Sequence, residues 1–358
     1  MKTELELNEM ILDLTNKIRE NRPELLKYLD EMPLTVPYEE NPEAVTMTLT
    51  TYYDSLVLLF DEKTGNSSDN MPPKAAENVP IVEIKTMELD NSYQNLLIEV
   101  NNIAISYNDY GEGTIPVLFL HGFPFDKSMW KGQIDSLKAT NRVIAIDIRG
   151  FGKSTDEKST LSIDLFADDL LAFMDKLNIE KAIICGLSMG GYIALNAVKR
   201  FPERFAALIL CDTQCIADTD AVKENRYKTI EQINLDGTTD FNEKFIASVF
   251  HPDSLAQKIE TVANLRSIVF ANSKEIITAG LRALAERSET CTSLVSIAIP
   301  TLIICGKQDT VTPLAQSEFM HKNCKGSILK VIDNAGHVAN LEHPEEFNKY
   351  LLDFLNSL

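Results

Sequence analysis

The stretch AIICGLSMGGYIALNAVKRF, residues 182–201, joins an apolar run to a segment with helical periodicity and carries G-x-S-x-G at the junction. In a strand–turn–helix context this motif holds a serine hydroxyl on a sharp turn, where it can act as a nucleophile. Such a turn is strained, so small residues are needed two positions to either side of Ser188, and Gly186 and Gly190 supply them. The pentapeptide alone also fits a glycine-rich turn with an incidental serine, but its position between strand and helix favours the nucleophile.

Two backbone N–H groups are candidates for holding a developing oxyanion. That of Met189 lies near the positive end of the predicted helix that follows Ser188. The second belongs to Phe123, directly after the pair His121-Gly122 that ends the apolar run VLFLHG at 117–122. Both side chains are also expected to line an apolar substrate pocket.

The candidate general base is His337, in a loop directly after the last predicted strand, ILKVI at 328–332. Active sites of α/β proteins form at the carboxyl ends of the strands, which places this loop at the same sheet edge as Ser188. His121 is an alternative base, although a structural role, in which it hydrogen-bonds nearby loop backbone, fits it better. The other histidines are expected at a helix start, in an inserted helical region and on a helix: His343, His251 and His321.

Asp309 is the candidate carboxylate that orients His337, because it ends the strand TLIICGKQD at 301–309. The chain order serine, aspartate, histidine is the order expected when the serine lies on such an elbow. Asp212 ends the preceding strand and is the first alternative. Asp333 lies near His337 in the sequence and is expected to shape its turn.

The rest of the chain from about residue 96 alternates short apolar runs with helical stretches. The runs are nearly continuous in hydrophobicity, as strands buried on both faces of a parallel sheet require. The alternation predicts an α/β fold with a mostly parallel, doubly wound sheet, preceded by a hairpin that turns at Asn101-Asn102. About 85 residues with helical stretches at 218–232, 239–250, 253–268 and 272–288 separate two of the strands and predict a helical cap over the site.

Residues before the alternation have a different composition. Helical spacing and strong acidity mark 1–60, and 61–80 is rich in Gly, Ser, Asn and Pro, as linkers are. The predicted organisation is an acidic helical segment at 1–60, a linker at 61–80, a first core part at 81–213, a cap at 214–295 and a second core part at 296–358. The acidic segment is a candidate dimerisation arm or partner-docking element.

Charge and cysteine usage narrow the possible function. A net charge of −19 disfavours nucleic-acid binding, since a polyanion would be repelled. The six cysteines show no metal-like spacing, and no two histidines have metal-ligand spacing, so we expect reduced, mostly buried thiols and no metal. The first residues lack a signal-peptide pattern and the chain has no long apolar stretch, which predicts a cytoplasmic protein without a membrane partner.

Taken together, these motifs resemble the large α/β-hydrolase family, in particular its esterase, lactonase and non-haem haloperoxidase-like branch, which includes 3-oxoadipate enol-lactonases. The similar stretches are HGFPFD at 121–126, DIRGFGKS at 147–154, GLSMGGYIAL at 186–195, CGKQDTVTP at 305–313 and NAGHVANLEHPEEFN at 334–348. They cover about 81–358 and exclude 1–80. The resemblance implies the α/β-hydrolase fold, triad roles for Ser188, Asp309 and His337, and oxyanion roles for Phe123 and Met189. It also implies that Asp147 and Arg149 brace loops.

The expected function is hydrolysis of a small-molecule ester or lactone through an acyl-enzyme, with no cofactor. Two alternatives stay open: perhydrolysis by the same triad, and a small-molecule sensor that uses the same pocket without turnover. No cluster of Arg or Lys marks a carboxylated substrate.

Overall fold

The computed structural model describes residues 93–156 and 160–358, together with Met10, Leu14, Lys17 and Tyr53. The predicted acidic helical segment, its role in dimerisation and the linker at 61–80 therefore lie outside the described residues, apart from those four. All residues from 93 onward belong to one compact unit.

An eight-stranded sheet forms the centre of this unit, in the order β1-β2-β4-β3-β5-β6-β7-β8. The strands are β1 Leu96–Val100, β2 Ile103–Tyr110, β3 Val117–Leu120, β4 Val143–Ile146, β5 Ala182–Leu187, β6 Phe205–Cys211, β7 Thr301–Gly306 and β8 Ile328–Ile332. The first two form the predicted antiparallel hairpin, β2 is antiparallel to β4, and the strands from β3 to β8 pair in parallel. The predicted mostly parallel sheet is confirmed.

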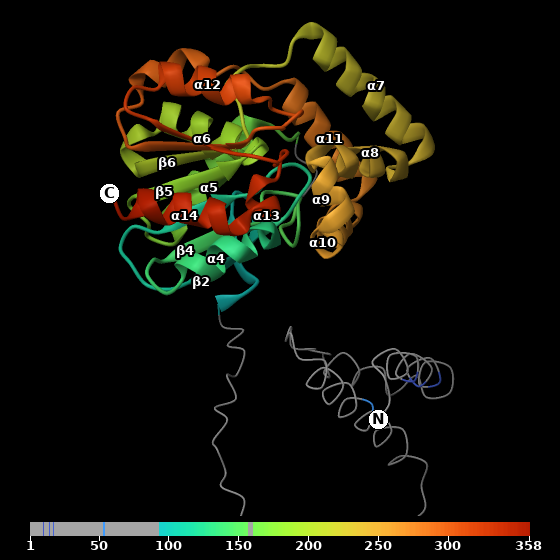
Figure 1. Ribbon diagram of the computed structural model, residues 1–358, viewed down its shortest axis with the longest axis horizontal. Coiled ribbons are helices and arrows are strands. Elements are labelled where there is room, and N and C mark those ends of the chain that lie inside the picture. Colours follow the sequence, from blue (N-terminus) through green and yellow to red (C-terminus); the bar gives the residue numbers. More distant parts are fainter. Residues whose placement is uncertain (1–9, 11–13, 15–16, 18–52, 54–92, 157–159) are drawn as a thin grey trace, which may run out of the picture. The chain divides into compact units, whose positions relative to one another are not determined.

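Helices cover both faces of the sheet, because the inner strands are apolar on both sides. One face carries α5 (Ile163–Lys176), α6 (Met189–Arg200) and α12 (Leu314–Asn323); the other carries α4 (Lys131–Leu137) and α14 (Pro344–Leu355) (Figure 1). Four further short helical segments of the described residues lie outside the five cap helices: η3 Lys127–Trp130, η4 Pro202–Arg204, η5 Cys291–Ser296 and α13 Ala339–Glu342.

Five α-helices follow β6 and precede β7, and they gather beside the core as a separate group (Figure 1). They are α7 Asp220–Asp236, α8 Thr239–Val249, α9 Pro252–Gln257, α10 Ile259–Phe270 and α11 Lys274–Ala285. The stretch predicted as one helix at 253–268 is two, because Lys258 leaves the helical region with φ −104° and ψ 53°. The apolar periodicity continues across this break, so the spacing did not reveal it.

The prediction that the cysteines are reduced is wrong for two of them. Cys215 and Cys291 form a disulfide, whereas Cys185, Cys211, Cys305 and Cys324 are free and buried. The bonded pair is 76 residues apart in sequence, but its Cα atoms are 4.8 Å apart. The fold brings the two ends of the cap insertion together at the core, which sequence spacing does not show.

Within the described ranges, no helix is both long and apolar enough to cross a membrane.

Candidate active site

Ser188 lies on a strained turn between β5 and α6, as the motif predicts. Its backbone has φ 51° and ψ −113°, a conformation that non-glycine residues rarely adopt. Gly186 and Gly190 are both required by close packing, since a Cβ on Gly186 would lie 2.2 Å from the Gly190 carbonyl oxygen and a Cβ on Gly190 2.2 Å from that of Leu120. The turn therefore holds the serine at the carboxyl end of a central strand.

Two further residues support this turn and were not singled out from the sequence. A Cβ on Gly191 would lie 2.4 Å from Thr213 Oγ1. The same Thr213 hydroxyl donates to the Ser188 carbonyl at 2.8 Å. The Ser188 N–H donates to the Cys211 carbonyl at 3.0 Å, so β6 braces the elbow from the side.

His337 and Asp309 meet, as predicted, at the ends of β8 and β7. The His337 Nδ1 and Asp309 Oδ2 atoms are 2.8 Å apart, and both side chains are almost fully buried. Because an ionised carboxylate only accepts, Nδ1 carries the proton and Nε2 has a free lone pair. Thr312, which the sequence reasoning missed, donates its hydroxyl to Asp309 Oδ2 at 2.7 Å, and its N–H to Oδ1 at 3.0 Å.

His337 and Asp309 shift each other's pKa values. Burial, the largest single influence, would raise the pKa of Asp309, but the charge and hydrogen bond of His337 and the bonds from Thr312 together lower it. For His337, burial would lower the pKa, yet the charge and hydrogen bond of Asp309 outweigh it and raise the pKa. The imidazole is therefore a stronger base than an isolated histidine.

The two alternative carboxyls, Asp212 and Asp333, make their hydrogen bonds and ion pairs elsewhere and not to His337. Asp212 Oδ1 accepts from the Gly306 N–H at 2.7 Å, and its Oδ2 has no partner among the described residues. Burial and then the negative charge of Asp309 raise the pKa of Asp212 to about 8, which favours its protonated form near neutral pH. Asp333 pairs instead with Lys307 at 2.7 Å.

The two predicted oxyanion donors lie on neighbouring loops. Met189 is the first residue of α6, so its N–H has no acceptor within the helix. The Phe123 N–H makes no hydrogen bond to another residue of the described ranges. The loop of Phe123 follows β3, and the turn of Met189 follows β5. These two strands pair with each other, and Leu120 lies opposite Gly186. Both N–H groups are thus available at the edge where Ser188 lies.

His121 has the structural role expected for it. Its Nδ1 donates to the Gly122 carbonyl at 2.8 Å and its Nε2 accepts from the Ile148 N–H at 2.9 Å. Burial lowers the pKa of this histidine, which keeps the ring neutral. Since both nitrogens are engaged with backbone, His121 is not available as the base.

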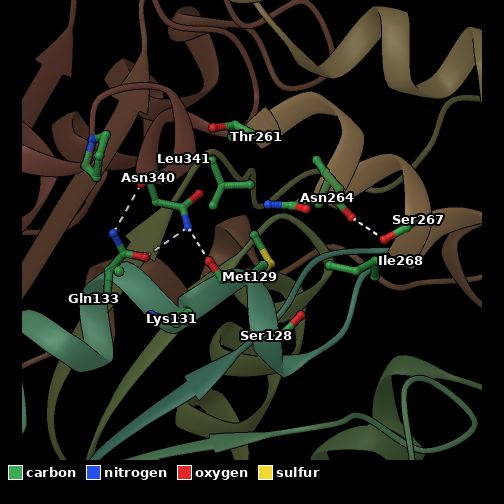
Figure 2. A pocket seen from close by; sticks show the side chains of 13 residues that line it. Ser128, Met129, Lys131, Gln133, Thr261, Asn264, Ser267, Ile268, Asn340 and Leu341 are labelled. Atoms are coloured by element: carbon green, nitrogen blue, oxygen red, sulfur yellow. Dashed lines mark hydrogen bonds between the residues drawn. The ribbon is translucent and has the colours of Figure 1, made fainter. Parts of the chain in front are cut away.

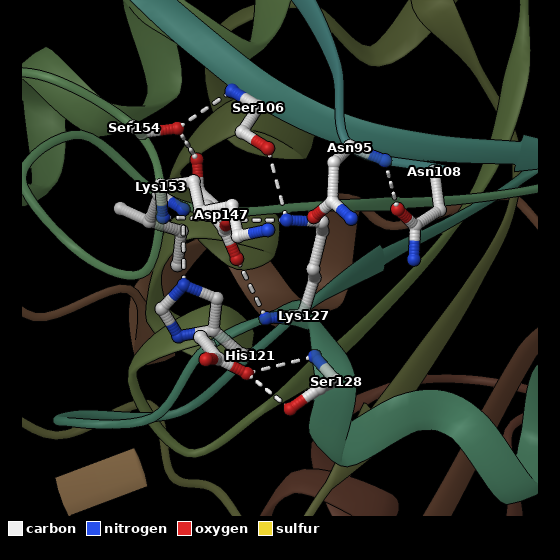
Figure 3. Close-up of polar contacts among 11 residues, drawn as sticks. Asn95, Ser106, Asn108, His121, Lys127, Ser128, Asp147, Lys153 and Ser154 are labelled. Atoms are coloured by element: carbon white, nitrogen blue, oxygen red, sulfur yellow. Dashed lines mark hydrogen bonds and ion pairs between the residues drawn. The ribbon is translucent and has the colours of Figure 1, made fainter. Parts of the chain in front are cut away.

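A buried charge cluster beside His121 holds the loop after β3, which carries the predicted oxyanion donor Phe123 (Figure 3). The Lys127 ammonium contacts Asp147 Oδ2 at 2.6 Å and donates to the Ser106 hydroxyl at 2.9 Å. Asp147 also accepts from the backbone N–H groups of Lys127 and Lys153. This agrees with the loop-bracing role implied for Asp147, but sequence reasoning did not find Lys127, because exposed lysines are the norm.

Arg149, the other residue expected to brace loops, forms a bidentate salt bridge with Asp169. Its Nε and Nη2 atoms lie 2.6 and 2.7 Å from the carboxylate oxygens. Both side chains are buried, so the pair fixes the loop after β4 to α5.

The loop of His337 is tied to the cap. The His337 N–H donates to the Val249 carbonyl at the end of α8, at 2.7 Å. Glu342 is completely buried and accepts from the Gly336 N–H at 2.6 Å and the His251 N–H at 2.7 Å. One carboxylate therefore bridges the cap and the histidine loop, which no local sequence signal indicated.

The described residues contain no group of His, Cys, Asp and Glu side chains that could hold a metal. A cavity of about 440 Å³ lies between α4, α10 and α13 (Figure 2). Its lining includes Met129, Asn264 and Asn340 but none of Ser188, Asp309 and His337. The Asn340 amide at its edge donates to the Met129 carbonyl and the Gln133 side chain.

Comparisons with known proteins agree with the fold and identify the family. Residues 115–344 match the alpha/beta hydrolase fold family. A 3-oxoadipate enol-lactonase of Acinetobacter baylyi is 33% identical over 254 residues, which cover 69% of this chain and 91% of that protein. A thermophilic esterase from Thermogutta terrifontis has a TM-score of 0.70 and 32% identity, covering 74% of this chain and 98% of its own. The enol-lactonase from Burkholderia xenovorans has a TM-score of 0.69 and 25% identity, covering 73% and 100%.

Proposed function

Because the chain belongs to the α/β-hydrolase fold family, we propose that it is a serine hydrolase that cleaves a small carboxylic ester or lactone. The observation that carries the proposal is the buried His337–Asp309 pair at the sheet edge where the strained Ser188 turn lies. Two of the similar proteins are named as an enol-lactonase and an esterase, which supports the same reaction class.

The proposed reaction starts when the Ser188 hydroxyl attacks the substrate carbonyl carbon and His337 Nε2 takes the hydroxyl proton. Asp309 stabilises the resulting imidazolium through its bond to Nδ1. The N–H groups of Phe123 and Met189 hold the carbonyl oxygen as it becomes negative.

Collapse of this intermediate breaks the bond to the leaving oxygen, which receives the proton from His337. The product is an acyl group on Ser188; from a lactone, the new hydroxyl remains attached to that group. Water then attacks the acyl carbon while His337 removes its proton. The bond between the acyl carbon and the Ser188 oxygen breaks, that oxygen takes the proton back from His337, and the free acid leaves. Each step uses groups of the chain and water, so the proposal needs no cofactor.

The nucleophile is tested by replacing Ser188 with alanine and measuring hydrolysis of p-nitrophenyl acetate and labelling by a fluorophosphonate. We expect a loss of about 10⁴-fold or more in kcat and no labelling. Ser296→Ala, at an exposed serine that bonds only its own helical turn, is the matched control. A folded Ser188→Ala protein that keeps the parent rate would rule out the assignment.

A further inference from the structure

The side chain of Phe123 connects the proposed oxyanion site to the cap. Its ring is 5% exposed. The ring centroids of Phe241 and Phe245, both on α8, lie 6.4 and 6.3 Å from that of Phe123. Phe151 packs against the same ring edge-on at 5.9 Å. The cap side of the carbonyl-binding position is therefore hydrocarbon.

The same two cap rings also line a cavity. It has a volume of about 510 Å³ and is lined by residues of α7 and α8. These are the first two helices of the cap (Figure 1). Phe241 and Phe245 stack at 5.9 Å with 27° between their planes, and Ile233 of α7 adds apolar surface. The two rings thus contact both the cavity and the ring of Phe123. A cavity of this size suits a small ligand.

Charge at this cavity disfavours an anionic ligand. Asp236 and Asp240 line it together with a single cation, Lys244. Two buried cations outside the cavity, one in the core and one in the cap, have carboxylate partners of their own: Lys127 pairs with Asp147, and Arg287 with Asp218 at 2.7 Å. A substrate carboxylate in the cavity would therefore meet more negative charge than positive.

We propose that this cavity, the α7–α8 groove, receives the uncharged acyl chain of the substrate, and that Phe241 and Phe245 separate it from the carbonyl site. This rests on the proposed hydrolase function, and it defines the substrate as a neutral ester or lactone with a medium-length apolar acyl group. The rings turn aside to admit the chain, which then replaces their contacts with its own. Each buried methylene raises kcat/KM roughly fourfold, from its transfer out of water.

The first test compares p-nitrophenyl acetate, butanoate and octanoate, and the octanoate analogue with a terminal carboxylate. We expect kcat/KM to rise from acetate to octanoate and to fall at least tenfold when the carboxylate is added. An Asp236→Asn/Asp240→Asn variant should recover part of the loss with the charged ester. Equal kcat/KM for acetate and octanoate, or no penalty for the carboxylate, would overturn the assignment.

The second test fills the groove. Thr229 lines it, and its hydroxyl bonds only the Asn225 carbonyl in its own helix. Thr229→Trp should lower the octanoate-to-acetate ratio of kcat/KM at least tenfold, because the indole occupies the space that the octanoyl chain would fill. The matched control is Thr278→Trp on α11, where the hydroxyl bonds Glu275 in the same way and the side chain does not line the groove.

The outcomes separate the two proposals. Hydrolysis that depends on Ser188 but shows the same chain-length profile in the parent and in Thr229→Trp overturns the groove alone. Absence of any Ser188-dependent hydrolysis and of fluorophosphonate labelling overturns the hydrolase function, and the groove assignment falls with it.

Discussion

Two buried carboxyls lie at the sheet edge of the proposed active site, and their different hydrogen-bond partners give them different properties. Asp309 accepts from His337 Nδ1 at 2.8 Å and is held by Thr312. Asp212 accepts a backbone N–H and has a pKa raised to about 8, first by burial and then by Asp309. A neutral Asp212 next to an ionised Asp309 avoids placing two negative charges in one buried site.

Replacing Asp309 with asparagine should remove the acceptor that keeps the proton on His337 Nδ1. We expect kcat to fall by about 10⁴-fold, because the wrong tautomer cannot take the serine proton. Asp212→Asn is the matched control and should keep kcat within about tenfold of the parent, since the amide copies the protonated acid. Steady-state kinetics on p-nitrophenyl acetate measure both, and a larger loss from Asp212→Asn would reverse the assignment.

Asn242 on α8 is fully buried, and neither its Oδ1 nor its Nδ2 atom has a partner among the described residues. Asn242→Leu should therefore raise the free energy of unfolding by about 1–3 kcal/mol, since it removes unsatisfied polar groups. Asn340→Leu, at an equally buried asparagine that donates to Met129 and Gln133, should lower it. Urea unfolding measures both changes, and a destabilised Asn242→Leu protein would contradict the prediction.

Among the elements, the cap is held at both of its ends. The disulfide joins Cys215, before α7, to Cys291, after α11. The Thr290 N–H donates to the Cys215 carbonyl at 2.8 Å, and the buried Arg287–Asp218 pair lies next to it. These contacts fix where the five cap helices leave and rejoin the sheet.

Removal of the disulfide should destabilise the protein by about 2–4 kcal/mol, because the bond closes a long loop in the unfolded chain. A Cys215→Ser/Cys291→Ser protein should melt at a lower temperature than the oxidised parent and should not respond to a reductant. The parent should lose stability when it is reduced. Thiol titration of the unreduced parent under denaturing conditions should find four free thiols. Six free thiols in the untreated parent would contradict the bond.

At the scale of the whole molecule, stability should depend on pH through Asp212. The folded protein keeps the Asp212 proton up to a pKa of about 8, whereas the unfolded chain releases it near a pH of about 4. Between these values unfolding releases a proton, so the free energy of unfolding falls as pH rises. The raised pKa of His337 also makes the free energy of unfolding fall as pH rises above the usual pKa of histidine, because the folded state holds that proton more tightly.

Asp212→Asn should therefore flatten the decline between pH values of about 4 and 8, where one such group contributes up to about 1.4 kcal/mol per pH unit. Urea unfolding of the parent and the variant at several pH values measures this difference. Asp333→Asn, at an exposed carboxylate, is the control and should leave the slope unchanged. Parallel curves for the parent and Asp212→Asn would contradict the prediction.

Much of the fold and of the candidate site followed from the sequence, because local rules apply there. Runs buried on both faces predicted the strands from β3 to β7, and glycines around Ser188 marked a turn that only small neighbours permit. Loops after parallel strands must meet at one edge, so Asp309 and His337 could be paired before any distance was known. The strained Ser188 backbone and the His337–Asp309 hydrogen bond agree with that reasoning.

Contacts between distant segments were decided by the tertiary structure alone. The disulfide joins residues 76 positions apart, Glu342 bridges the histidine loop and the cap, and Lys127 is buried against Asp147. None of these contacts can be recognised from neighbouring residues in the sequence, because a cysteine, a glutamate or a lysine can lie either at the surface or in a buried pair. Their partners exist only once the sheet and the cap bring separate parts of the chain within bonding distance.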